Sequence, residues 1–144
     1  MTLPFNESRF DELHEAAMAL AERGDRERKR GDAAGARALY ALALQQELQA
    51  LRLVAPDAEP SRSVLLRSAA SLAFDAQDAD TAWRLLAEAL AGNPPAALRH
   101  ELDELQEALI RYEFEAPRST RPPWQGFREV DDADADSHRA PRAA

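Results

Sequence analysis

The chain has 144 residues, a formal net charge of −8 and no cysteine. This length suits one domain with a single core. The acidic balance argues against a general nucleic-acid binder, and the lack of cysteine excludes disulfides and thiolate metal sites. No secretory signal and no run of 18 apolar residues is visible, so we expect a cytoplasmic protein without a membrane span. The preference for Arg over Lys and the abundance of Ala suggest a bacterial genome.

The first predicted element is a helix that starts near Asn6 or Ser8, either of which can cap it. Ala, Leu, Glu and Arg dominate the composition and favour helix, while no alternating β-branched run predicts a strand. The helix has an apolar stripe at spacings of three and four, made of Phe10, Leu13, Ala17, Leu20 and Ala21. The stripe ends after Gly24. Residues 25–30 are all charged, which predicts a solvated extension or a frayed turn.

Four more helices are predicted in an all-α fold, at about residues 33–54, from 61 or 63 to 76, from 78 or 80 to 92, and at 96–113. Two prolines keep the linker of residues 55–60 out of helix. The fifth helix is expected to cap the domain of residues 1–115. Residues 116–144 contain prolines, acidic runs and no helical period, so we expect a disordered acidic tail.

An internal repeat relates two predicted helical hairpins. The segment GDAAGARALYALAL (31–44) aligns with QDADTAWRLLAEAL (77–90). The alignment matches Asp32 with Asp78, Ala36 with Ala82, Tyr40 with Leu86, Ala43 with Ala89, and Leu44 with Leu90. Small Ala residues let two antiparallel helices approach closely, and the large residue fills the gap between them. The repeat therefore predicts two hairpins that are packed in the same way.

This pattern resembles the tetratricopeptide repeat (TPR) family, which has Gly-Asp at the bend, then Ala, an aromatic and Ala, and a closing Pro. The matching residues are Gly31, Asp32, Ala36, Tyr40 and Ala43, then Asp78, Ala82, Ala89 and Pro94, with Leu66, Ala70 and Ala73 in the preceding helix. The repeat-like units, about 18–48 and 63–94, are 46 residues apart, from 32 to 78, whereas the family uses 34. The resemblance implies a short TPR-like α-solenoid of antiparallel hairpins. A plain five-helix bundle is the alternative.

The resemblance also implies a partner-binding groove. The family's groove positions, carried over to the later unit, fall on Val64, Arg67, Ser68, Ser71 and Phe74. Arg67 and Ser71 are one helical turn apart and could hold a carboxylate of a partner through charge-assisted hydrogen bonds. In the alternative interpretation Arg67 is simply solvated and Phe74 belongs to the core.

A basic rim precedes the first bend and consists of Arg23, Arg26, Arg28, Lys29 and Arg30. Such a cluster can hold phosphates in a salt-dependent way. However, Asp25, Glu27 and Asp32 are interleaved with it, and no aromatic residue accompanies it for base stacking. We therefore expect the rim to meet an acidic partner protein or the protein's own acidic tail, with a regulatory nucleic-acid or nucleoprotein contact as the alternative.

Neither catalysis nor metal binding is indicated by the sequence. His14, His100 and His138 are isolated, and no phosphate loop or nucleophile elbow is present. The acidic run Asp131, Asp132, Asp134 and Asp136 lacks the Gly and Glu of a calcium-binding loop. We expect no enzyme activity, cofactor or metal site.

Two large apolar residues, Trp124 and Phe127, stand out in the predicted tail. They indicate a docking peptide, a segment that docks on its own domain, or a bystander. The sequence as a whole predicts a non-catalytic protein–protein interaction module, an adaptor or accessory subunit of a larger bacterial protein or complex. Its partner and oligomeric state are left open.

Overall fold

The computed structural model describes residues 5–115. The chain forms α1 (Glu7–Lys29), α2 (Ala33–Arg52), α3 (Ser61–Asp75), α4 (Ala79–Ala91) and α5 (Ala96–Glu115). Within these residues there is no strand, which confirms the predicted all-α fold with five helices. The predicted tail, with Trp124 and Phe127, lies outside the described residues. The TPR resemblance stays a prediction.

The chain divides by its internal contacts into two units, residues 1–109 and 110–144. The first unit contains α1 to α4 and most of α5. Of the second unit the structure describes only residues 110–115, the last residues of α5. The core and all of the sites discussed below belong to the first unit.

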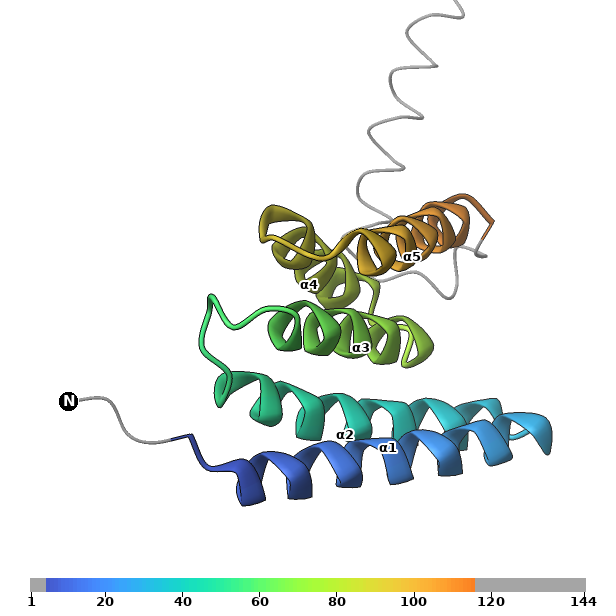
Figure 1. Ribbon diagram of the computed structural model, residues 1–144. Coiled ribbons are helices and arrows are strands. Elements are labelled where there is room, and N and C mark those ends of the chain that lie inside the picture. The colour runs from blue at the N-terminus through green and yellow to red at the C-terminus, as the bar shows by residue number, and fades with distance from the viewer. Residues whose placement is uncertain (1–4, 116–144) are drawn as a thin grey trace, which may run out of the picture. The chain divides into compact units, whose positions relative to one another are not determined.

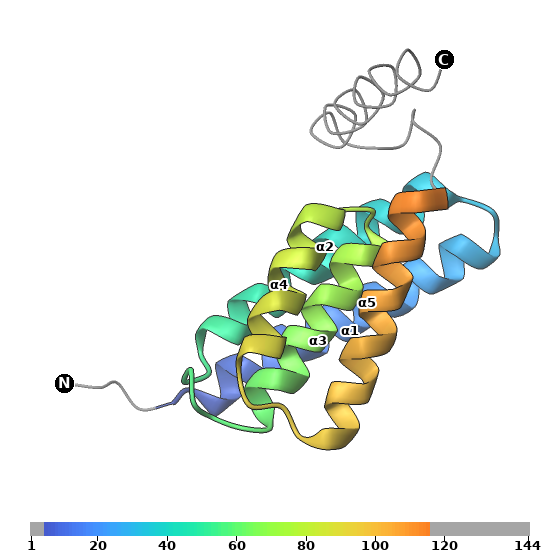
Figure 2. The same ribbon diagram turned by 90° about the horizontal axis from the view of Figure 1, so that it is seen from above.

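Consecutive helices of the first unit are antiparallel, and α1 packs mainly on α2, α2 on α3, and α3 on α4 (Figures 1 and 2). The start of α1, the end of α2 and the start of α3 therefore lie at one end. The end of α1, with the basic rim, lies at the other. None of the helices in the described part of the chain is long and apolar enough to cross a membrane.

The bends that open α2 and α4 have the same local geometry. The Asp32 and Asp78 side chains each accept a hydrogen bond from the backbone amide three residues later, at 2.9 and 3.2 Å. The preceding residues, Gly31 and Gln77, both have left-handed backbone angles, with φ values of 89° and 61°. The aligned segments of the internal repeat thus begin with the same cap, which satisfies amide groups at the helix start.

The core is built mostly from Ala and Leu, and one larger residue, Tyr40, fills the gap between α1 and α2. A Cβ atom on Gly24 would lie 2.8 Å from a ring carbon of Tyr40, so this position of α1 has room only for Gly. The Tyr40 hydroxyl donates a hydrogen bond to Asp25 at 2.5 Å, and the Arg28 guanidinium lies 5.7 Å from the ring centroid. The Tyr40 ring is therefore held in place, and moving it aside would break these contacts.

The substitution Gly24→Ala tests this close approach. Helix propensity alone favours Ala by about 1 kcal/mol, but crowding in a packed core costs about 1–3 kcal/mol. We expect a net loss of roughly 1 kcal/mol in the free energy of unfolding, measured by urea denaturation. As the control, Gly24→Ala in a Tyr40→Leu background should not lower the free energy of unfolding. Leu, the residue at the matching position 86, lacks the ring that crowds Gly24. A more stable Gly24→Ala single variant would contradict the packing account.

Candidate functional site

A fully buried carboxylate lies where α1, α2 and α3 meet. Glu47 of α2 is 0% exposed. One of its carboxylate oxygens is 2.9 Å from Nδ1 of His14 on α1, and the other accepts a hydrogen bond from the Ser68 hydroxyl on α3 at 3.0 Å. Burying a carboxylate is costly unless its oxygens are paired. This network therefore determines which faces of α1 and α3 meet α2.

Two of the predicted groove residues have partners within their own chain. The Ser68 hydroxyl is engaged by the buried carboxylate of Glu47. The Arg67 Nε atom donates to a carboxylate oxygen of Glu101 on α5 at 2.8 Å. The carboxylate that Arg67 contacts thus belongs to its own chain, and the contact with a carboxylate of a partner stays a prediction. The Arg67 side chain is still 40% exposed.

The other three predicted groove residues differ in exposure. Val64 is 47% exposed. Ser71 and Phe74 are half-buried, and Phe74 packs against the core. The structure thus places the five predicted residues along α3 from an exposed start to a partly buried end, and only Val64 offers a large exposed apolar surface.

Three ring side chains, Phe5, Phe10 and His14, lie in a row along the start of α1. The ring centroids of Phe5 and Phe10 are 5.6 Å apart, and Phe10 stacks on His14 with centroids 6.1 Å apart. Sequence reasoning assigned Phe10 to the core stripe and missed Phe5. The signal was present, because Phe5 precedes the N-cap Asn6 and Phe10 is the fourth helical residue, which is the spacing of a hydrophobic staple.

A cavity of about 750 Å³ opens beside this row, and we call it the α1–α3 groove. Its apolar and small lining residues include Phe5 and Phe10 of the α1 start, Leu53, Val54 and Pro56 after α2, and Ser61 of α3. Phe5 is 55% exposed. Two acidic side chains, Glu7 and Asp11, line the α1 wall, and Arg52 lines the groove from α2.

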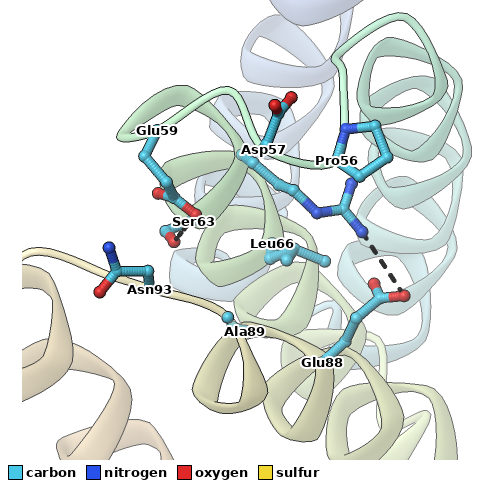
Figure 3. A pocket seen from close by; sticks show the side chains of 10 residues that line it. Pro56, Asp57, Glu59, Ser63, Leu66, Glu88, Ala89 and Asn93 are labelled. Atoms are coloured by element: carbon cyan, nitrogen blue, oxygen red, sulfur yellow. Dashed lines mark hydrogen bonds and ion pairs between the residues drawn. The ribbon is translucent and has the colours of Figure 1, made fainter.

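A second cavity, of about 290 Å³, is polar and lies between the linker, the start of α3 and the end of α4 (Figure 3). Arg62 is the cation in its lining, and its guanidinium is 3.7 Å from a carboxylate oxygen of Glu88. The buried Ser63 hydroxyl donates to Glu59 at 2.9 Å. Arg62 with Glu88 and Ser63 with Glu59 thus pair four of the polar side chains, and Asp57 and Asn93 also line the cavity.

Four of the five rim residues belong to a continuous helix, because α1 extends through the charged run to Lys29, and Arg30 is the C-cap of α1. This agrees with a solvated extension rather than a frayed turn. Arg28 pairs with Asp25 at 3.2 Å, and Arg30 with Glu27 at 3.0 Å. Ion pairs between described residues do not involve the other three rim cations, Arg23, Arg26 and Lys29. The rim therefore keeps part of its positive charge for other contacts.

Two ionisable groups near the rim have shifted pKa values. Burial raises the pKa of Asp75, an effect that the positive charge of Arg28 opposes and the negative charge of Asp25 adds to. Burial and the hydrogen bond to Asp25 raise the pKa of Tyr40 to about 12. No cluster of three or more His, Asp or Glu that could hold a metal ion occurs in the part of the chain that the structure describes.

Removal of the buried carboxylate tests the network of Glu47, His14 and Ser68, which we call the three-helix junction. Glu47→Ala should lower the free energy of unfolding by about 2–4 kcal/mol, because two hydrogen bonds and the packing of a buried side chain are lost. The control is Glu12→Ala, an exposed position on α1, which should change stability by less than about 0.5 kcal/mol. Equal effects of the two substitutions in denaturant titrations would contradict the proposed role of Glu47.

The raised pKa of Asp75 predicts how stability depends on pH. The Asp75 carboxyl binds its proton more tightly in the native state than in the unfolded chain. The contribution of Asp75 to stability therefore falls as the pH rises past 3.8, the ordinary pKa of this carboxyl group. Asp75→Asn should therefore increase the melting temperature near neutral pH and reduce this decline. Asp103→Asn on the exposed face of α5 is the control. If stability fell with rising pH as steeply in Asp75→Asn as in the wild type, Asp75 would not be the group responsible.

Comparison with known proteins assigns no function to the chain. No protein-family model, curated protein or solved structure matches the chain. The groove, the three-helix junction and the basic rim are therefore the features from which a function can be inferred.

Proposed function

We propose that this chain is a non-catalytic protein–protein interaction module, an adaptor or accessory subunit, which binds a segment of a partner protein in the α1–α3 groove. The observation that carries the proposal is the cavity of about 750 Å³ beside Phe5, whose side chain is more than half exposed. Open cavities of this size with apolar walls and a few charged groups are typical of binding sites.

Further support comes from α3. Ser61 lines the groove, and the exposed Val64 follows one helical turn later. Arg67 comes one turn beyond Val64 and remains partly exposed. Val64 and Arg67 do not line the cavity, and it is the TPR resemblance that extends the proposed binding surface to them along α3. The TPR resemblance implies that the first helix of each unit contacts the partner, and α1 and α3 are those helices.

A second candidate function is a nucleic-acid or nucleoprotein contact through the basic rim, favoured by the three rim cations without an ion pair among the described residues. The net charge of −8 opposes it. Salt-dependent retention on DNA or RNA separates the two functions. Retention of the wild type, and its loss in an Arg23→Glu, Arg26→Glu variant, would support the second candidate.

Phe5→Ala tests the groove. A tagged full-length chain is used to recover partners from its source cells, and the recovered protein is then purified and titrated. Loss of an aromatic anchor should weaken binding by about tenfold or more. Leu42→Ala is the matched control, because Leu42 on α2 is also about half exposed, at 49%, and lines neither cavity. Partner binding that Phe5→Ala leaves intact would refute the groove as the binding site.

The α3 side has its own test. An Arg67→Glu, Ser71→Ala double variant should weaken the same complex, because it reverses the charge of the predicted groove helix. Circular dichroism must show that the fold is retained, since the change also removes the pair with Glu101. Unchanged affinity would restrict the site to the start of α1 and the linker.

A further inference from the structure

We infer that the occupant of the α1–α3 groove is an amphipathic helix of a partner protein, with basic residues along the edge of its apolar face that lies next to α1. This inference rests on the proposed function and specifies the partner's chemistry. The length of the apolar wall, the lack of a sheet edge in the groove and the charges that line it support this occupant.

The apolar wall of the groove is short. On α1 the cavity is lined by Glu7, Phe10 and Asp11, and the stack of rings continues past them to His14, which is bound to the buried Glu47. At 1.5 Å per residue this stretch is roughly 10 Å long, about two helical turns. Two or three large apolar side chains, spaced three or four residues apart, would cover it.

A helix suits this groove better than an extended segment. No strand occurs among residues 5–115, so the groove presents no sheet edge of backbone donors and acceptors to an extended segment. The amide and carbonyl groups of an extended segment would lose water without gaining partners, which is costly. A helix satisfies its backbone internally and presents its apolar side chains on one face, the usual mode of binding between helices.

The charged residues of the groove indicate which charges the partner carries along the edges of its apolar face. Glu7 and Asp11 are exposed, lie one turn apart on the α1 wall, and make no ion pair with any described residue. Arg52 at the end of α2 is the cation in the lining. Lys or Arg residues on the partner's edge beside α1 would meet both carboxylates, and an acidic residue on the other edge would meet Arg52. This charge pattern also fixes the direction in which the partner helix lies.

Two synthetic peptides test the inference on the full chain by fluorescence anisotropy. Both place Leu at helical spacing on one face, and the flanking residues are Lys in one peptide and Glu in the other. We expect the Leu/Lys peptide to bind at least about tenfold more tightly, since like charges would face Glu7 and Asp11 in the Leu/Glu complex. Equal affinities would overturn the inferred charge of the partner.

A matched pair of variants separates the groove from the overall negative charge. Glu7→Gln with Asp11→Asn should weaken binding of the Leu/Lys peptide about three- to tenfold, the effect of losing two exposed ion pairs. Asp103→Asn with Glu107→Gln removes the same two charges, at the same spacing, from the exposed face of α5, and should leave affinity unchanged. Equal losses in the two variants would show diffuse attraction only and would overturn the inference.

The remaining outcomes distinguish the inference from the function on which it rests. If Phe5→Ala weakens both peptides and these bind equally well, the groove function is supported and the inferred charge fails. If the natural partner depends on Phe5 but the Leu/Lys peptide does not, the groove function stands and the helix inference is wrong. Binding of anionic phospholipid vesicles that requires Phe5 would replace the protein helix by a lipid surface and would overturn the inference.

Discussion

The buried carboxylate of Glu47 is the interaction on which the arrangement of the first three helices depends. One of its oxygens contacts His14 of α1 and the other contacts Ser68 of α3, so a single side chain of α2 is bonded to both neighbouring helices. A shift of either helix by one turn would leave one oxygen of the buried carboxylate without its partner, which is costly. Because Phe10 stacks on His14, the same contact also sets the position of the aromatic row and hence of the groove wall.

The two ends of the first unit have different chemistry as a result of the helix directions. The α1 start carries acidic residues beside an apolar groove, and its last turn carries Arg26, Arg28 and Lys29. Both placements suit the helix dipole, which favours anions at the start and cations at the end. The basic rim and the groove are therefore separate surfaces at opposite ends of α1. A partner that uses both would have to extend along this helix.

Most of the fold could be predicted because its signals are local. The period of the apolar stripes indicated the helices, and Asp32 and Asp78 indicated where α2 and α4 begin. The matched small residues of the repeat, such as Ala36 and Ala82, are buried in both hairpins. The sequence allowed either Asn6 or Ser8 to cap α1. The hydrogen bond that the Asn6 side chain accepts from the Arg9 amide shows that Asn6 is the cap.

The sequence by itself determined five helices, their capped bends and the repeat that relates two hairpins, since each depends on residues a few positions apart. Only the tertiary structure decided which polar residues of these helices face inward and which surface stays open. Ser68, predicted for a groove, is bonded to a carboxylate 21 residues away, and Phe5 forms a groove wall together with residues that follow α2. Such contacts depend on how the helices pack against one another, and a helical period reports only which residues share a face of their own helix.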